Sequence, residues 1–492
     1  MIEYHSTRGS ADTRTSAQAI IKGIAEDRGL YVPDSIPSLP FKPEEMAGRP
    51  YQEVAFRIIK AFFQDFSDDE MEKCVCGAYD GKFEEKEIVP LTEAGGAYFL
   101  ELYHGKTAAF KDMALSILPY LLTTAMKKEK ESKKICILTA TSGDTGKAAL
   151  EGFADVEGTE IIVFYPNKGV SQVQERQMIT QEGSNTNVFA VNGNFDDAQT
   201  AVKDIFGDSG FAGELAGLDC RLSSANSINI GRLVPQVAYY VYGYIKLIER
   251  GVIEPGEKIN IVVPTGNFGN ILAAYYAGEM GIPVNRFICA SNRNKILTDF
   301  INTGVYDLHR DFYLTISPSM DILISSNLER LLYHLSGGDG NEIAALMKSM
   351  KEEKKYTVSP KIRAGMEKFR GGYTDDEGTL KTIGQMYREH GYLIDTHTAV
   401  AYSVYEQYRQ ETSDETPALI ASTASAYKFA DSVAEAIGVG KGIDGFDSIR
   451  KIARESCVRV PAGLKELDRK EIRHGKVINI PEMRQAVKDS LR

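Results

Sequence analysis

Between about residues 130 and 280 the hydrophobic positions alternate between short apolar runs and longer amphipathic stretches. Runs such as 134–139 (KICILT) and 160–165 are typical of buried strands, because they are short and rich in β-branched residues. Stretches such as 147–153 and 171–180, which follow them, have helical spacing. This alternation predicts an α/β fold in which parallel sheets are flanked by helices. Further strands are predicted at 187–191, 258–263 and 417–421, and further helices at 195–206 and 271–280.

The rest of the chain has mainly helical patterns. Ser67 and Glu70 fit a capping box, which predicts that a new helix opens there. Apolar residues at helical spacing predict helices at 17–24, 51–66, 233–248, 322–335 and 343–350.

These patterns suggest a division into domains. We expect an extra N-terminal domain at 1–98 and a larger domain built from 99–127 and 211–470. A smaller domain is expected at 128–210, with a C-terminal tail at 471–492. The length of 492 residues is ample for several domains.

Composition and charge narrow the range of partners. The chain is 43% hydrophobic and 25% charged, with a formal net charge of -11. The negative electrostatic field of a chain with this charge repels nucleic acid and anionic membrane surfaces, so neither is expected as a partner. An anionic small-molecule substrate would require local positive charge.

Cysteine usage and the N-terminal residues favour a reducing cytoplasm. The start of the chain has no basic region followed by an apolar run, and no stretch of about 18 apolar residues occurs. The cysteines lack the spacing of a zinc site or a disulfide framework, so no metal is expected. They are Cys74, Cys76, Cys136, Cys220, Cys289 and Cys457.

Lys111 is the first candidate for chemistry. It lies in an apolar segment rich in glycine and alanine, residues 102–115, and burial there would favour the neutral amine. A neutral lysine can condense with a carbonyl, so Lys111 is a candidate Schiff-base lysine. The alternative is an ordinary solvated lysine.

Three turns that follow predicted strands or open predicted helices could bind anions. Residues 141–146 (TSGDTG) offer hydroxyl groups and free N–H groups at a helix start. They do not form a P-loop, since Thr141 and Ala148 stand where that motif needs glycine and Ser or Thr. Residues 264–270 carry glycines that allow close approach to a phosphate. Asn226, Ser227 and Arg232 could bind another phosphate, although Asn226 and Ser227 could also be helix caps.

Several segments together resemble threonine synthases, which are fold type II pyridoxal phosphate (PLP) enzymes related to the tryptophan synthase β subunit. The resemblance spans Tyr4 to Phe429. Lys106 replaces a common proline, and residues 425–427 (SAY) also depart from the family pattern. The matching segments are HGKTAAFKDMAL (104–115), TSGDTGKAAL (141–150), SSANSINIGR (223–232), GNFGN (266–270) and DTHTAV (395–400).

The resemblance implies PLP as cofactor and conversion of O-phospho-L-homoserine and water into L-threonine and phosphate, the last step of threonine biosynthesis. Lys111 would be the catalytic, cofactor-binding lysine, and Thr423 would contact the pyridine nitrogen. His397 would be a structural histidine rather than a chemical one. A monomer or homodimer with a smaller domain that closes over substrate is expected. The other cofactor-binding residues would be Gly266, Asn267, Phe268, Gly269 and Asn270; the substrate-binding residues would be Thr141, Ser142, Thr145, Asn226, Ser227, Arg232 and Asn267.

Two other interpretations remain open. The first is a serine or threonine dehydratase on the same fold, against which Arg232 and the N-terminal domain count. The second is a catalytically idle homologue with a binding or signalling role. The presence of Lys111, Thr423 and GNFGN disfavours it, because an idle site need not keep them.

Overall fold

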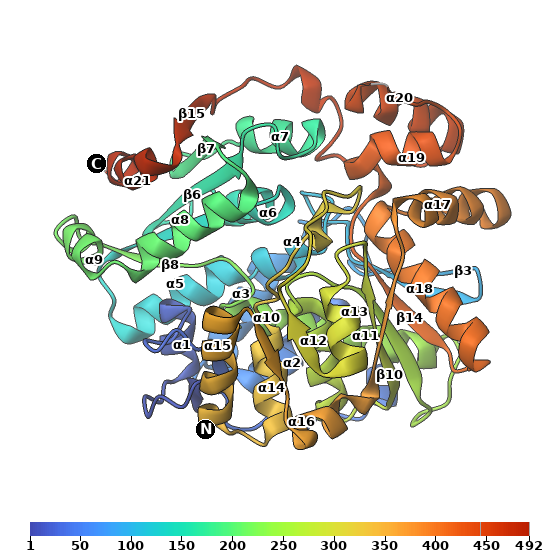
Figure 1. Cartoon of the computed structure of the whole chain (residues 1–492), viewed down its shortest axis with the longest axis horizontal. Coiled ribbons are helices and arrows are strands. Elements are labelled where there is room, and N and C mark those ends of the chain that lie inside the picture. Colours follow the sequence, from blue (N-terminus) through green and yellow to red (C-terminus); the bar gives the residue numbers. More distant parts are fainter. Residues whose placement is uncertain (443, 492) are drawn as a thin grey trace.

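The computed structural model describes residues 1–442 and 444–491, and two mainly parallel sheets dominate it (Figure 1). The larger sheet has six strands. Its adjacent strands pair in parallel, except that β3 and β4 pair antiparallel. Its strands, in spatial order, are β13 (Phe369–Tyr373), β10 (Val284–Ser291), β9 (Ile259–Pro264), β14 (Ala418–Ser422), β4 (Ala97–Glu101) and β3 (Leu91–Ala94).

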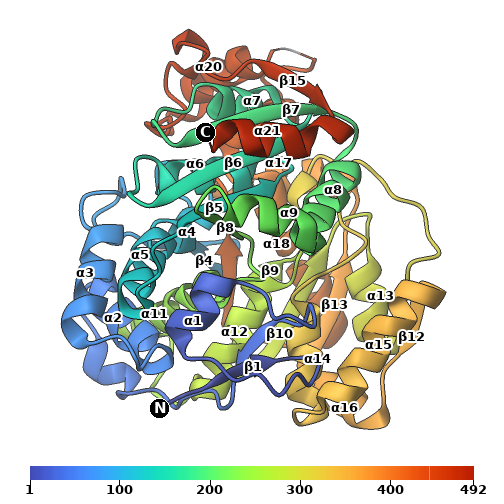
Figure 2. The same cartoon turned by 90° about the vertical axis from the view of Figure 1, so that its left-hand side faces the viewer.

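The smaller sheet is fully parallel and lies above the larger one in Figure 2. It is flanked by α6 (Asp144–Phe153), α7 (Gln172–Ile179) and α8 (Phe195–Gly207). The α/β prediction is therefore confirmed for both sheets. The strands of the smaller sheet, in spatial order, are β15 (Lys476–Asn479), β7 (Thr186–Asn192), β6 (Thr159–Pro166), β5 (Lys134–Ala140) and β8 (Cys220–Ser223).

Strand pairing also refines the expected domains, whose boundaries remain a prediction. β8 pairs with β5, and β15 pairs with β7. A strand shares the cooperative hydrogen bonding of its sheet. We therefore propose that the smaller domain also includes 220–223 and 476–490, beyond the expected 128–210.

The N-terminal residues form helices packed against the larger sheet's helices. These are α1 (Ser16–Lys22), α2 (Tyr51–Phe62) and α3 (Asp68–Tyr79). The capping box is confirmed, because the Ser67 hydroxyl accepts from the N–H of Glu70 and the Glu70 carboxylate accepts from the N–H of Ser67. The short strands β1 (Tyr4–Ser6) and β2 (Tyr31–Pro33) pair antiparallel.

Three helix predictions differ from the structure. The helix expected at 51–66 ends at Phe62. The stretch 233–248 falls in two helices, α10 (Ile230–Leu233) and α11 (Pro235–Glu249), because Pro235 has no N–H to continue the first. Helix α14 begins only at Leu328 and ends at Ser336, so the prediction for 322–327 was wrong. The side chains of Ser325 and Asn327 there bond to the backbone oxygens of Gly266 and Asn267 instead.

The remaining helices pack around the two sheets. They are α4 (Lys111–Leu115), α5 (Leu118–Glu129), α9 (Ser209–Ala216), α12 (Gly269–Met280), α13 (Ile296–Thr303), α15 (Gly340–Glu353), α16 (Pro360–Gly365), α17 (Asp376–His390), α18 (Thr396–Thr412), α19 (Ala430–Ala436), α20 (Gly445–Ser456) and α21 (Met483–Ser490). Strands β11 (Val305–Asp307) and β12 (Lys355–Thr357) form a separate antiparallel pair.

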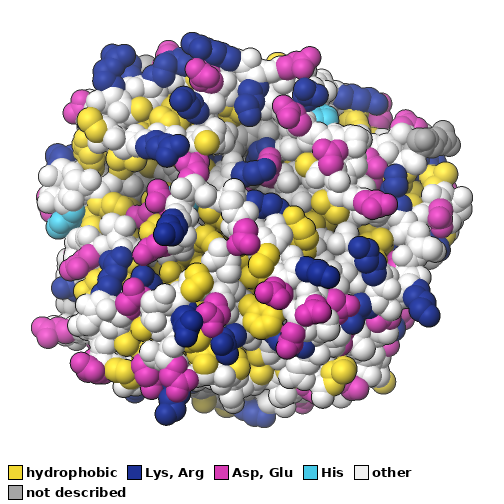
Figure 3. All heavy atoms as spheres, turned by 180° about the vertical axis from the view of Figure 1, so that it is seen from behind, with side chains coloured by type: hydrophobic (Ala, Val, Ile, Leu, Met, Phe, Trp, Pro, Cys, Tyr) yellow, Lys and Arg dark blue, Asp and Glu magenta, His cyan; other side chains and the backbone are white. Residues whose placement is uncertain are grey.

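On the face seen in Figure 3, basic and acidic side chains are interspersed. This is expected for a chain with 57 Lys and Arg and 68 Asp and Glu residues. Within the described residues, no helix combines the length and the apolar character needed to cross a bilayer.

The two sheets turn the carboxyl ends of their strands toward one region. β5 ends just before Thr141, and β8 ends just before Ser224. From the larger sheet, β9 leads to Thr265 and β14 leads to Thr423. Ligands of open α/β sheets bind beyond the carboxyl ends of the strands, so this region is the candidate site.

Candidate active site

A cavity of about 190 Å³ lies where these strand ends meet. Both sheets contribute to its walls, and α8 adds a further side with Gln199 and Lys203. The structure brings every predicted site residue to this one cavity, while their individual roles remain predictions. These lining residues are Lys111, Thr141, Ser142, Thr145, Asn226, Ser227, Arg232, Gly266, Asn267, Phe268, Gly269, Asn270 and Thr423.

Lys111 is the first residue of α4 and is 8% exposed. The loop before it is fixed to the segment after β14, because Phe110 donates its N–H to the Thr423 carbonyl at 2.8 Å and Ser425 donates to the Ala108 carbonyl at 3.1 Å. Burial lowers the pKa of Lys111 below the usual lysine value. The interpretation as an ordinary solvated lysine is therefore excluded.

Asp144 is the first residue of α6, and its carboxylate accepts hydrogen bonds from two lysines. Both lysines lie in segments that follow strands of the larger sheet. The Oδ2 of Asp144 is 3.4 Å from the Nζ of Lys111, and its Oδ1 is 2.8 Å from the Nζ of Lys428. The Gln174 side-chain amide also donates to Oδ1 at 2.9 Å. Burial alone would raise the pKa of Asp144, but Lys428 and Lys111 reverse this effect and hold it well below its usual range. Asp144 is therefore an anion.

The turn at 141–146 is held by its first side chain. The Thr141 hydroxyl oxygen accepts from the N–H groups of Gly143 at 3.0 Å and Gly146 at 2.9 Å. Gly143 has a φ of +128°, which side-chain-bearing residues rarely adopt. This conformation leaves Ser142 and Thr145 lining the cavity.

The loop 264–270 brings backbone close to the cavity at the start of α12. Phe268 adopts a left-handed conformation with a φ of +64° just before the helix begins at Gly269. A Cβ on Gly266 would lie 2.5 Å from the Ser319 carbonyl oxygen, so only glycine fits there. The Nδ2 of Asn270 is buried and has no hydrogen-bond partner among the described residues. A buried donor at a helix N-terminus fits an anion such as the PLP phosphate.

Arg232 supplies a buried guanidinium on the same cavity. It is 5% exposed and donates from one terminal nitrogen to the Ala225 carbonyl at 2.6 Å. Burial lowers its pKa to about 10. Its Nε has no partner in the described part of the chain. A buried charge with an unused donor fits an anionic ligand, such as a second phosphate.

His397 lies on the cavity wall in a hydrogen-bonded position. Its Nδ1 is 2.9 Å from the Asp395 carboxylate, and its Nε2 accepts from the N–H of Ser319 at 3.1 Å. Both ring nitrogens are therefore used by the protein. This supports the interpretation of a structural histidine, as the sequence suggested.

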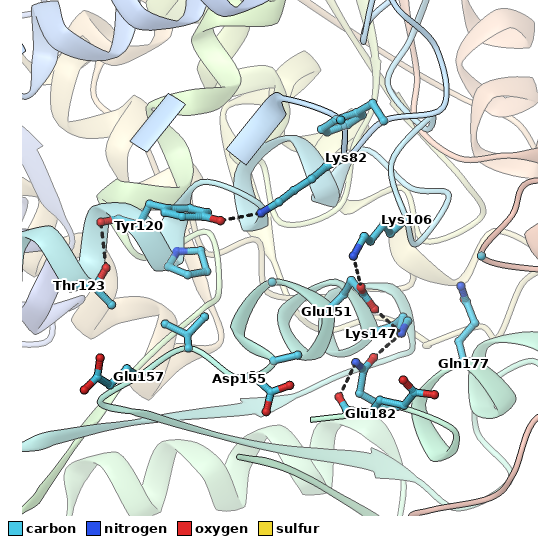
Figure 4. Close-up of a pocket in the computed structure, with 18 of the residues that line it drawn as sticks. Lys82, Lys106, Tyr120, Thr123, Lys147, Glu151, Asp155, Glu157, Gln177 and Glu182 are labelled. Atoms are coloured by element: carbon cyan, nitrogen blue, oxygen red, sulfur yellow. Dashed lines mark hydrogen bonds and ion pairs between the residues drawn. The ribbon is translucent and has the colours of Figure 1, made fainter. Parts of the chain in front are cut away.

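Lys106 turns away from this cavity. Its Nζ is 3.1 Å from Glu151, in a separate hollow of about 1230 Å³. Figure 4 shows Lys106 and Lys147 both pointing toward Glu151. The replacement of proline by Lys106 thus adds no charge to the walls of the candidate site.

Sequence reasoning missed Asp144 and Lys428 as partners of Lys111. Asp144 was part of a motif chosen for its hydroxyl groups and N–H groups, and Lys428 stood in a segment valued only for Thr423. Their meeting depends on the packing of the two sheets. An acid between two lysines from distant segments is visible only in three dimensions.

Comparison with known proteins agrees with this geometry. The model "Threonine synthase N terminus" matches residues 3–79, "Pyridoxal-phosphate dependent enzyme" matches 88–423 and "Threonine synthase, C-terminal" matches 398–490. The chain is 40% identical to the threonine synthase of Pseudomonas aeruginosa, over 89% of this chain and 91% of that one. It is 39% identical to human threonine synthase-like 1 over 86% of this chain, but it spans only 58% of that protein. The crystal structure of PLP-bound threonine synthase from Brucella melitensis superposes with a TM-score of 0.87 at 34% identity, covering 100% of both chains.

The fold and the cavity with its buried lysine are those of a fold type II, PLP-dependent enzyme. Within that class, the matches extend over both ends of the chain as well as the PLP-binding part. The chain belongs to the threonine synthase family.

Proposed function

We propose that this chain converts O-phospho-L-homoserine and water into L-threonine and phosphate, with Lys111 as its catalytic lysine. The observation that carries the proposal is the shared cavity of Lys111 and Arg232. A buried amine suits covalent attachment of the cofactor and proton transfer. A buried guanidinium with an unused Nε suits a phosphorylated substrate. The site thus combines the two features that this reaction requires.

The residues present fit PLP. The N-terminus of α12, with Gly266 to Asn270, would hold the cofactor phosphate, and Thr423 would contact the pyridine nitrogen. When bound, PLP stabilises the negative charge that remains after a proton leaves the substrate carbon. A hydroxyl partner such as Thr423 suits a neutral pyridine nitrogen, since it cannot protonate the ring as an acid would.

Lys111 would act as both base and acid. With the substrate bound, its Nζ would accept the Cα proton and deliver a proton later. Its lowered pKa favours the neutral amine needed for the first step. The Asp144 carboxylate 3.4 Å away can stabilise the ammonium that results.

The phosphate of the substrate would be held by Arg232 with Asn226 and Ser227. The turn at 141–145 would receive the substrate carboxylate, because its N–H groups and hydroxyls stand at the start of α6. Binding the two anionic ends fixes the carbon chain between them and places Cα beside Lys111. Holding the phosphate after its bond breaks keeps it available as a base.

The test is to mix the purified protein with PLP and O-phosphohomoserine and to measure released phosphate and threonine. We expect both products in equal amounts. A 2-oxo acid and ammonia formed from serine or threonine, without use of O-phosphohomoserine, would favour a dehydratase. A bound cofactor with no product from any of these substrates would favour an idle homologue.

The proposal also covers the cellular location, the oligomeric state and the partners of the enzyme. We propose a cytoplasmic location, which the six free cysteines support, because exposed thiols such as Cys76 and Cys457 persist in a reducing compartment. We also propose a monomer or homodimer that acts on a small molecule and requires no nucleic acid or membrane. Size-exclusion chromatography with light scattering would measure the oligomeric state.

A further inference from the structure

Three charged side chains form a buried cluster beside the cavity, which we call the charge triad: Lys111, Asp144 and Lys428. The two lysines contact different oxygens of one carboxylate. Lys111 lies 3.4 Å from Oδ2, and Lys428 lies 2.8 Å from Oδ1. Their exposed fractions are 8% for Lys111, 3% for Asp144 and 0% for Lys428.

Lys428 is held in place by more than its contact with Asp144. Its Nζ also donates to the Thr107 carbonyl at 2.9 Å, and the Gln177 side-chain amide donates to the same carbonyl at 3.3 Å. Asp112 in turn accepts from both the N–H and the hydroxyl of Thr107, at 2.8 and 2.6 Å. Two acceptors, the Thr107 carbonyl and the Oδ1 of Asp144, therefore hold the Nζ of Lys428.

The triad spans the two sheets. Asp144 comes from the turn after β5, in the smaller sheet, while Lys428 lies in the short helix Ala426–Phe429 after β14, in the larger sheet. Lys111 stands between them at the start of α4. The charge balance around Lys111 thus depends on the contact between two layers of the fold.

The proposed chemistry makes opposite demands on Lys111. It must be neutral to bond to the cofactor and to accept a proton, yet it must be stable as an ammonium after accepting that proton. A lone carboxylate would hold the lysine in its charged form. A carboxylate already paired with a second cation stabilises the ammonium form of Lys111 less, so both the neutral and the charged form of Lys111 become accessible.

We propose that Lys428 and Asp144 are positioning residues that act as an opposed pair on Lys111: Asp144 stabilises its ammonium form, and Lys428 limits that stabilisation. This deepens the proposed function, because it rests on Lys111 as the cofactor lysine. Neither partner need touch the substrate.

Other charged side chains lie around Lys111 and the cavity. Lys203, from α8, lines the same cavity. Arg232, from α10, opposes the ammonium, as Lys428 does. Asp112, the next residue, directs its carboxylate to Thr107 instead. On α6, the side chain of Lys147 pairs with Glu151 away from the cavity. Asp144 and Lys428 are therefore the pair whose removal should move the charge state of Lys111 in opposite directions.

The experiment measures the protonation of Lys111 directly in the apoenzyme. A pulse of an amine-acylating reagent labels only neutral lysine, and mass spectrometry reads the labelled fraction of Lys111 at each pH. In Asp144→Asn the ammonium loses its partner, so the midpoint should move to lower pH by about one unit or more. In Lys428→Met the Asp144 charge is no longer offset, so the midpoint should rise by a similar amount. The double variant should return toward the wild-type midpoint.

A second readout uses the cofactor. The rate at which apoenzyme and PLP develop the visible absorption band depends on the neutral fraction of Lys111. The titration of PLP itself is common to all variants, so differences between them report the lysine. We expect the pH dependence of this rate to move in the same two directions as the labelling midpoints.

Two controls separate charge from damage to the fold. Lys428→Arg keeps the charge and should leave the midpoint within about half a unit of wild type. Lys147→Met removes another buried lysine of α6 and should also leave it unchanged. If Lys428→Met fails to fold by circular dichroism, Lys428→Gln takes its place.

Midpoint shifts in the same direction in both single variants, or in neither, would overturn the proposal. A shift in Lys147→Met as large as that in Lys428→Met would overturn it as well. Because the labelling needs neither PLP nor substrate, these results are distinct from a failure of the proposed reaction, which would appear as missing threonine with the midpoints still displaced.

Discussion

The imidazole of His397 accepts a hydrogen bond from the backbone N–H of Ser319, at a distance of 3.1 Å. The ring nitrogen that accepts must be unprotonated, so the proton of the neutral ring is on Nδ1, which donates to Asp395 at 2.9 Å. The Ser319 carbonyl lies against Gly266. His397 therefore braces the cavity wall behind the loop expected to hold the cofactor phosphate.

Replacing His397 with alanine should weaken this wall without removing a group that takes part in the reaction. We expect the free energy of unfolding to fall by about 1–3 kcal/mol, since the partly buried N–H of Ser319 loses its acceptor, and PLP to dissociate more readily. Turnover at saturating PLP should fall by less than about tenfold. His397→Gln, which can restore an acceptor, should recover part of the loss. A general acid or base would instead cost about 10²–10⁴-fold, and such a loss in both variants would contradict the structural role.

Replacing Lys111 with alanine should remove both the cofactor attachment and the base. We expect the visible absorption band of the bound cofactor to disappear and threonine formation to fall by about 10²–10⁴-fold or more. Lys106→Ala is the matched control from the same segment, because its side chain faces Glu151 in the other hollow. That variant should keep the band and the rate. Wild-type threonine formation by Lys111→Ala would contradict the assignment.

Arg232→Lys should test the phosphate site. Lysine keeps the charge but loses the planar fork, and the site would lose one charge-assisted hydrogen bond, worth about 1.5–3 kcal/mol. The expected fall in kcat/KM for O-phosphohomoserine is therefore about 10- to 150-fold, with inhibition by inorganic phosphate weakened in parallel. Inhibition by phosphate at wild-type strength in Arg232→Lys would place the phosphate elsewhere.

The sequence predicted the parts of this site that depend on local pattern. A short apolar run followed by glycines and a helix defines a strand end, so the turn at 141–146 and the loop at 264–270 could be placed near each other by fold class alone. Lys111 was a candidate because of its apolar segment and Arg232 because a guanidinium can bind a phosphate, and the resemblance to a family then assigned their roles. Local patterns together with the family resemblance therefore identified the residues that line the cavity.

What the sequence did not predict depends on contacts between distant segments. The pairing of Asp144 with Lys428 needs both sheets in place, and no spacing rule joins them. Residues 322–327 have an apolar pattern, but Ser325 and Asn327 bond to the loop of Gly266 and Asn267 rather than to a helix. Tertiary hydrogen bonds there outweigh helical periodicity. The break at Pro235, by contrast, was present in the sequence.

Gly266→Ala should damage cofactor binding more than the fold. The added Cβ would lie 2.5 Å from the Ser319 carbonyl oxygen, a backbone atom that no side-chain rotation can move, so the loop must shift. Overpacking of this kind costs about 1–3 kcal/mol, and the shift moves the N–H groups at the start of α12. We expect at least a tenfold weaker affinity for PLP, measured by titration of the absorption band. Gly213→Ala is the control: its Cβ would meet nothing within 4 Å in α9, so PLP affinity should stay the same and stability should rise slightly.

Glu151 should make stability depend on pH in the acid range. Burial alone would raise its pKa, but Lys147 at 3.0 Å and Lys106 at 3.1 Å lower it to about 2. Because the folded-state pKa lies below the unfolded value of 4.5, the stabilisation is fully present above that pH and is lost as the pH falls toward 2. The Glu151 side chain is 25% exposed, so solvent screening reduces the expected contribution to about 1–3 kcal/mol at pH 7. Urea unfolding should show Glu151→Gln less stable than wild type by this amount at pH 7, with the difference shrinking below pH 4. A constant difference from pH 7 to pH 3 would contradict the assignment, because loss of packing alone does not titrate.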